Sequence, residues 1–208
     1  MPPSEARRPL TSRSTAWARA IAGALARSAV TPNQISVVSI AFAGVGAWLL
    51  VEWPTTAGLV LAAVCVQLRL ACNLFDGMVA IEGGKQSPTG ALYNELPDRI
   101  ADSLFLVAAG YTIGMPWLGW LGALLAALTA YIRATGGALG FAQDFRGPMA
   151  KPHRMAVLTL GCLAGAVEWH LAGTRHALLV ALAVIAAGSA LTCLTRTRAI
   201  AAQLRASA

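Results

Sequence analysis

The sequence predicts an all-α integral membrane protein with six transmembrane helices and an N-terminal amphipathic helix in the membrane interface. Of its 208 residues, 57% are hydrophobic and only 12% are charged, whereas soluble domains carry about 25% charged residues. The apolar residues also gather into runs near the length of about 20 residues that a bilayer-spanning helix needs. Finally, the basic residues gather in alternate connections between these runs. These observations exclude a water-soluble globular domain.

Residues 1–33 form the predicted N-terminal cytoplasmic region, a basic tail followed by the amphipathic helix. In this helix Trp17, Ile21 and Leu25 recur at every fourth position, with arginines on the opposite side. The apolar face would therefore enter lipid while the arginines meet the headgroups. A cleavable signal peptide is the alternative, but arginine interrupts an already weak apolar run. Pro32 predicts a break before the first span.

Six apolar runs form the predicted membrane domain, residues 34–195, which is followed by a short cytoplasmic tail, residues 196–208. The expected spans are residues 35–51, 57–75, 100–115, 118–133, 155–172 and 177–194. A Gly-Met-Pro turn alone separates the third span from the fourth, so the boundary between them is the least sharply defined.

The basic residues indicate the orientation of the chain. They precede the first span, follow the last one, and lie in the second and fourth connections, whereas the opposite connections hold only Arg175. Cytoplasmic loops carry an excess of Lys and Arg, so both termini and the 76–98 loop are expected to face the cytoplasm. The net charge of +7 then reflects topology, and we expect no nucleic acid partner. The small size and Ala/Arg-rich composition are typical of a bacterial inner (plasma) membrane protein.

Polar side chains form two stripes at the ends of the second and third spans. One helix face carries Arg69, Asn73, Asp76 and Gly77, and the next carries Asn94, Asp98 and Asp102. Helices joined by a short loop are usually antiparallel neighbours, so the stripes are expected to meet near the cytoplasmic surface. Charged groups at membrane depth mark functional sites by default. Capping of helix ends, the alternative, does not explain so many polar residues on two facing stripes.

The chemistry of these stripes predicts a site for a hard cation. Carboxylate and amide oxygens suit Mg²⁺ or Mn²⁺, and Mg²⁺ is commonly held by one or two carboxylates together with substrate phosphates. Glycines near both stripes leave room for a phosphorylated ligand to approach the backbone. We therefore expect Mg²⁺ (or Mn²⁺) as the cofactor.

The segment at residues 73–98 resembles the signature of the CDP-alcohol phosphatidyltransferase family, D-x2-D-G-x2-A-R-x8-G-x3-D-x3-D. Aligned without a gap, five of its eight fixed positions are identical: Asp76, Gly77, Ala80, Gly90 and Asp98. Asn73 and Asn94 stand where the signature has Asp, and Ile81 stands where it has Arg.

The resemblance implies a homodimeric membrane enzyme of phospholipid biosynthesis. Such an enzyme moves a phosphatidyl (or phosphoalcohol) group from a CDP-activated donor such as CDP-diacylglycerol to an alcohol or polyol-phosphate acceptor, and releases CMP. Carried over position by position, the metal ligands are Asn73, Asp76, Asn94 and Asp98, and Asp98 is also the general base. The resemblance also implies that Gly77, Ala80 and Gly90 lie beside the donor.

The departures from the signature lead to two further expectations. The resemblance implies two divalent ions, and the two asparagines remove negative charge that would balance them. We therefore expect weaker metal binding, with a single firmly held ion, unless Asp102 or Glu82 supplies a carboxylate. Asp102 is better placed, because it lies one turn from Asp98. Ile81 removes a cation near the nucleotide phosphates, and Arg69 is the expected substitute.

A second basic cluster precedes the fifth span. Arg133, Lys151 and Arg154 are expected to contact a phosphate of the acceptor or of a lipid, because such cations beside a metal site suit anionic substrates.

Two other functions stay open on the sequence. The asparagines and Ile81 would also suit a family member that has lost its chemistry but still binds a nucleotide lipid or a partner. A small transporter or channel subunit is the third reading, although the charges gather at one membrane face rather than at the midplane.

Overall fold

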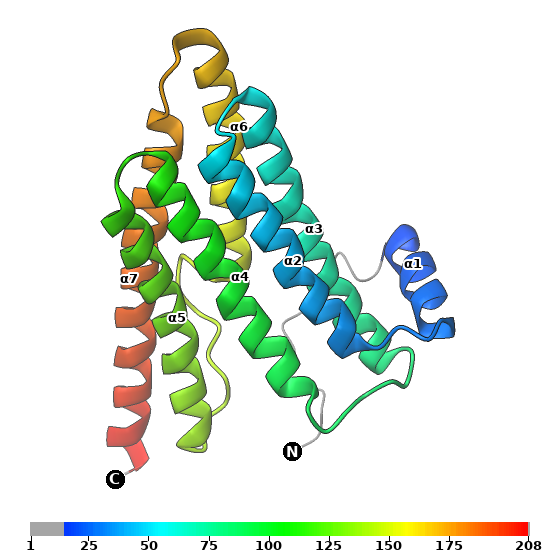
Figure 1. Ribbon diagram of the computed structural model, residues 1–208. Coiled ribbons are helices and arrows are strands. Elements are labelled where there is room, and N and C mark those ends of the chain that lie inside the picture. The colour runs from blue at the N-terminus through cyan, green and yellow to red at the C-terminus, as the bar shows by residue number, and fades with distance from the viewer. Residues whose placement is uncertain (1–14, 208) are drawn as a thin grey trace.

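The computed structural model describes residues 15–207 as seven α-helices and their connections (Figure 1). The helices are α1 Ala16–Arg27, α2 Pro32–Glu52, α3 Thr56–Ile81, α4 Gly90–Thr112, α5 Pro116–Ala138, α6 Lys151–Ala172 and α7 His176–Ser207. No strand occurs among these described residues. The all-helical class is therefore confirmed.

Five of the helices are long and apolar enough to cross a membrane, namely α2, α3, α5, α6 and α7. These five helices indicate a membrane protein. The expected third span lies largely in α4, which composition does not mark as a span because Glu95, Asp98, Arg99 and Asp102 all lie within it. Helix α7 continues unbroken to Ser207, so the expected C-terminal tail extends the last helix.

Local sequence signals set the start of α2. Thr31 accepts a hydrogen bond from the Gln34 backbone, and the Gln34 side chain accepts one from the Thr31 backbone. This reciprocal pair satisfies two N–H groups that a helix start otherwise leaves free. Pro32 occupies the first turn, where its missing N–H is not needed. The break expected at Pro32 is therefore confirmed.

The six long helices form a closed ring in the order α3, α2, α4, α5, α7, α6, with α6 packing back against α3. Helix α2 thus lies between α3 and α4. Our expectation that α3 and α4 pack as direct neighbours is wrong, because the connection at residues 82–89 is long enough to pass across the end of α2. Their polar ends nevertheless meet, as the site below shows.

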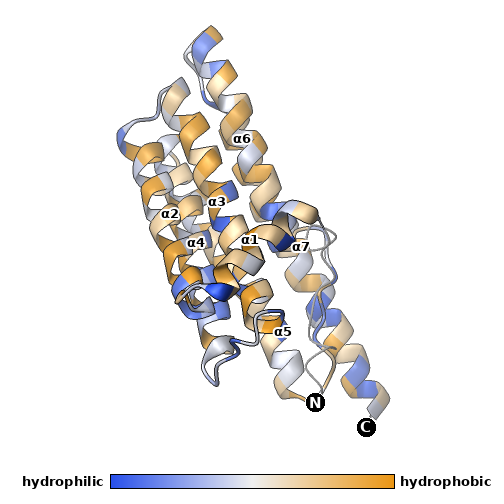
Figure 2. Ribbon diagram, turned by 90° about the vertical axis from the view of Figure 1, so that its right-hand side faces the viewer, coloured by the Kyte–Doolittle hydropathy of each residue, from blue (hydrophilic) through white to orange (hydrophobic). Residues whose placement is uncertain are grey.

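Hydrophilic residues gather at one end of this ring (Figure 2). We call it the loop end, because the longer connections at residues 82–89 and 139–150 lie there, whereas the short turns at residues 53–55, 113–115 and 173–175 lie at the other end. The helices between the two ends are mostly apolar on both their inner and outer surfaces.

Helix α1 packs beside the loop end of α3 (Figure 1). Its buried residues join a small apolar cluster made of Ala18, Ala22, Leu74 and Met78. The Trp17 ring meets the Phe75 ring edge-on, with 6.1 Å between centroids. Trp17 and Ile21 still expose about half of their surfaces, 54% and 42%. Helix α1 therefore keeps apolar side chains outside the bundle.

Helices α4 and α5 approach closely at Gly110 and Gly119. A Cβ atom on Gly119 would lie 2.6 Å from the Leu106 carbonyl oxygen and 3.0 Å from the Gly110 Cα. Because backbone atoms cannot move aside as a flexible side chain can, we expect Gly119→Ala to lower the free energy of unfolding by about 1–3 kcal/mol. Thermal unfolding in detergent measures this change.

Gly44→Ala is the matched control, because a Cβ atom there meets nothing within 4 Å. An unchanged melting temperature for Gly119→Ala would contradict the close approach of α4 and α5.

Candidate active site

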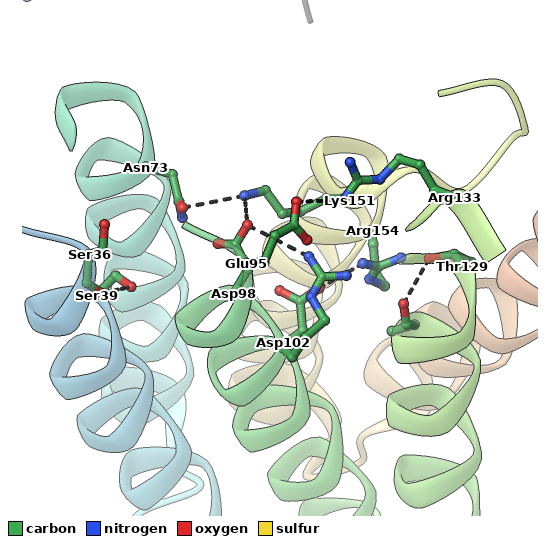
Figure 3. A network of polar contacts seen from close by, with 12 residues as sticks. Ser36, Ser39, Asn73, Glu95, Asp98, Asp102, Thr129, Arg133, Lys151 and Arg154 are labelled. Carbon is green, nitrogen blue, oxygen red and sulfur yellow. Dashed lines mark hydrogen bonds and ion pairs between the residues drawn. The ribbon is translucent and has the colours of Figure 1, made fainter. Parts of the chain in front are cut away.

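A network of buried charges joins three helices at the loop end (Figure 3). Arg69 of α3 is fully buried, and its Nη2 donates to Asp98 Oδ1 at 3.1 Å and to Asp102 Oδ1 at 2.7 Å. Arg154 of α6, which is 1% exposed, donates through Nη2 to Asp102 Oδ2 at 2.6 Å. Asp98 and Asp102 lie one turn apart on α4 and are both buried. The network therefore ties α3, α4 and α6 together inside the ring.

Lys151, the first residue of α6, bridges the two polar stripes (Figure 3). Its Nζ donates to Asn73 Oδ1 of α3 at 3.3 Å and forms an ion pair with Asp98 Oδ2 of α4. The Lys151 side chain is 26% exposed and the Asp98 side chain 5%. The ammonium thus lies at the more exposed edge of the buried network.

The two other polar motif residues, Asp76 and Asn94, differ in burial. Asp76 is buried on α3, and the Ser36 hydroxyl of α2 donates to its Oδ2 at 2.6 Å. Asn94, one turn before Asp98, is exposed. Ser36 was missed in the sequence, although a serine inside an apolar span is itself a signal of a polar partner.

Gly77, Ala80 and Gly90 are all partly exposed at the loop end. A Cβ atom on Gly90 would meet only the Ser87 Oγ, at 3.6 Å. The backbone at the start of α4 is therefore open enough for a ligand to approach.

Arg133 of α5 forms an ion pair outside the buried network. Its Nη2 lies 2.5 Å from Glu95 Oε1, its Nη1 donates to the Gln143 side chain, and its guanidinium lies over the Phe145 ring at 5.3 Å from the centroid. Glu95 was also missed in the sequence, because it lies next to the stripe of Asn94 and Asp98 rather than on it. Arg133 therefore lies between α4 and the 139–150 connection.

The structure brings the two stripes together, as expected. However, Asp102 and Arg69 contact partners other than the ones expected. Both oxygens of Asp102 accept from arginines, and Arg69 faces Asp98 and Asp102 rather than the position of Ile81. The expectations that Asp102 binds the metal and that Arg69 replaces the missing arginine therefore do not fit these contacts. Buried opposite charges on facing helices need each other as partners.

Comparison with known proteins identifies the family of this chain. The sequence model of the family described as CDP-alcohol phosphatidyltransferase matches residues 29–194. The chain belongs to this family. The phosphatidylinositol phosphate synthase of Corynebacterium glutamicum is 33% identical to the transferase over 181 residues, which cover 80% of this chain and 76% of the relative.

Solved structures share the fold of the transferase. The crystal structure of Mycobacterium tuberculosis phosphatidylinositol phosphate synthase with manganese and citrate has a TM-score of 0.74, with 22% identity and 88% coverage of both chains. The same protein with CDP-DAG bound has a TM-score of 0.73, with 22% identity and coverage of 88% of this chain and 92% of the other. At this identity the likeness shows the fold.

Family membership establishes the class of reaction. The chain is an enzyme of phospholipid synthesis that transfers a substituted phosphate group from a CDP-activated alcohol to a second alcohol and releases CMP.

The side chains that could bind a metal ion limit the number of divalent ions in the site of the transferase. Within residues 15–207 no three Asp, Glu, His or Cys side chains gather as a metal site. The signature carboxylates are Asp76 and Asp98, and Asp98 already pairs with Arg69, Lys151 and, at 3.6 Å, Arg99. Two dications would bring more positive charge than these two carboxylates balance. The residues fit one divalent ion, beside Asp76 and the asparagine oxygens, and do not fit two.

Proposed function

We propose that the transferase moves a phosphatidyl group from CDP-diacylglycerol to a polyol or polyol phosphate. The observation that carries this proposal is the position of Asp98, a buried acid at the point where the signature residues of α3 and α4 meet. Support for the donor comes from the M. tuberculosis relative, whose crystal structure contains CDP-DAG. The C. glutamicum relative, a phosphatidylinositol phosphate synthase, favours a phosphorylated polyol as the acceptor.

In this proposal Asp98 is the general base. A carboxylate offers about four lone-pair positions on its two oxygens, and here Arg69 occupies one on Oδ1 and Lys151 one on Oδ2. The acceptor hydroxyl can donate to one that remains. Asp98 then takes the hydroxyl proton while the oxygen bonds to the donor phosphorus and the bond from phosphorus to the CMP oxygen breaks.

We further propose that Asn73, Asp76 and Asn94 hold one Mg²⁺ or Mn²⁺ ion. Such an ion, when bound, neutralises charge on the phosphoryl oxygens. Gly77, Ala80 and Gly90 would let the donor diphosphate approach the backbone because none carries a side chain larger than a methyl group.

Two cations at the loop end are available to an acceptor phosphate. Lys151 is partly exposed, and the Arg133 side chain is 12% exposed beside the 139–150 connection. Arg154 is buried against Asp102 and the Met149 carbonyl oxygen, so we propose that it acts by holding Asp102 rather than by contacting substrate.

We propose that α4 also crosses the membrane, which together with α2, α3, α5, α6 and α7 gives six spans in a membrane domain at residues 34–195. The charged residues of α4 do not oppose this, because Asp98 and Asp102 are buried and paired inside the ring. The loop end would face the cytoplasm of a bacterial inner membrane, because the basic connections lie there. Residues 1–33 and 196–208 would then lie on the same side, with α1 in the interface. The homodimer stays a prediction.

Release of CMP tests the proposed reaction. The protein, purified in detergent, is supplied with CDP-diacylglycerol, Mg²⁺ or Mn²⁺, and each member of a panel of polyols and polyol phosphates. We expect CMP release that requires one acceptor, together with the matching phosphatidyl product in a mass spectrum. CDP-diacylglycerol binding without CMP release under any of these conditions would contradict the proposed donor and acceptors.

A further inference from the structure

Lys151 lies next to one of the two positions at which the signature acids are replaced by amides. Its Nζ is 3.3 Å from Asn73 Oδ1 and pairs with Asp98 Oδ2. An asparagine keeps the acceptor oxygen of an aspartate but not its charge. The ammonium therefore lies between an uncharged and a charged oxygen ligand, one from each polar stripe.

We infer that the Lys151 ammonium replaces one of the two metal ions expected at this motif, so that the transferase binds a single divalent cation. This inference rests on the proposed function, in which the motif handles the donor diphosphate. An ammonium has three N–H donors, and the described contacts of Lys151 use two of them, toward Asn73 and Asp98. The third can donate to a phosphate oxygen of a bound substrate, where a second metal ion would otherwise bind.

Charge balance supports the substitution. Asp98 already faces the cations of Arg69, Lys151 and, at 3.6 Å, Arg99. Asp102 faces those of Arg69 and Arg154. Arg69 even keeps its Nε and Nη1 without an acceptor among residues 15–207. A second dication at Asp98 would therefore enter a buried region that already holds enough positive charge, where like charges repel strongly. Lys151 and a metal ion on Asp98 exclude each other.

The fold holds Lys151 in this place. Met149, two residues earlier, donates its backbone N–H to Thr192 Oγ1 of α7 at 3.0 Å, and Arg154 donates to the Met149 carbonyl oxygen at 3.2 Å. The first contact fixes the start of α6 against α7, and the second ties Arg154 of α6 to the residues just before the helix. Because a cation in the first turn of a helix opposes the helix dipole, the position of the ammonium depends on Asn73 and Asp98.

Titration of the purified full-length protein with Mn²⁺, followed by electron paramagnetic resonance, tests the inference without donor or turnover. We expect one Mn²⁺ per chain for the wild type. Lys151→Gln should bind Mn²⁺ roughly tenfold more tightly, because a nearby like charge is removed. Adding Asn73→Asp and Asn94→Asp to Lys151→Gln should give two Mn²⁺ per chain, with the line broadening of neighbouring spins.

The controls use the other lysine of the chain and the conservative change. Lys85 lies in the 82–89 connection, where its Nζ donates to the Val30 carbonyl oxygen at 3.1 Å, so Lys85→Gln should leave Mn²⁺ binding unchanged. Lys151→Arg should keep one Mn²⁺ per chain. Two Mn²⁺ on the wild type, or equal Mn²⁺ affinity of wild type and Lys151→Gln, would overturn the inference. The wild-type count needs no variant and is independent of CMP release, so each proposal can fail alone.

Discussion

Asp98→Asn is expected to reduce CMP release by about 10²–10⁴-fold, the usual contribution of a general base. The amide keeps the size of the side chain, but its single oxygen can accept from Arg69 or from Lys151 and not from both, and it cannot take the acceptor proton. The fall should appear mainly in kcat, because donor binding depends on other groups. Steady-state CMP release at saturating donor and acceptor measures it, and thermal unfolding shows whether the variant remains folded.

Glu52→Gln is the control for this experiment. Glu52 is an exposed acid at the opposite end of α2, so its loss should leave CMP release unchanged. If folded Asp98→Asn kept more than a tenth of the wild-type rate, Asp98 would not be the base.

Asp102→Asn is expected to lower the free energy of unfolding by about 3–5 kcal/mol, because it breaks a buried ion-pair network from one side. The two oxygens of Asp102 each accept from a different arginine, Arg69 at 2.7 Å and Arg154 at 2.6 Å, and both arginines are at least 99% buried. Without the carboxylate, these two cations have too little negative charge near them. Thermal unfolding in detergent, with yield from the membrane as a second measure, reports the loss.

Two comparisons make this prediction specific. Asp144→Asn removes a carboxylate paired with Arg146; the Arg146 side chain is 57% exposed and the Asp144 side chain 14%, so its effect should be clearly smaller than that of Asp102→Asn. Replacing Asp102, Arg69 and Arg154 together by leucine should recover much of the lost stability, since a buried ion network can often be exchanged for apolar residues. A melting temperature for Asp102→Asn equal to that of Asp144→Asn would contradict the buried network.

The parts of the fold that local sequence encodes were predicted well. The apolar runs at residues 35–51, 57–75, 118–133, 155–172 and 177–194 all lie inside helices. The break at Pro32 coincides with the start of α2. Helix propensity, capping and apolar length act over a few residues, so the chain alone reveals them.

The residues that form the candidate site could be predicted only in part from the sequence. Helical spacing placed Asp98 and Asp102 on one face of α4, and the structure confirms that both are buried at the loop end. Spacing within one helix does not tell which cation from another helix each acid meets. Arg69 was therefore expected near the nucleotide, and Ser36 and Glu95 were overlooked.

The sequence by itself determined the helical, membrane-bound class of this protein and its family, because length, hydropathy and the spacing of residues 73–98 are properties of the chain read in order. Only the tertiary structure decided that α2 separates α3 from α4. It also decided that Asp102 forms ion pairs with two arginines and that Lys151 contacts both Asn73 and Asp98. Those contacts join residues far apart in sequence, and they depend on the rotation and order of whole helices around the ring, which no local pattern specifies.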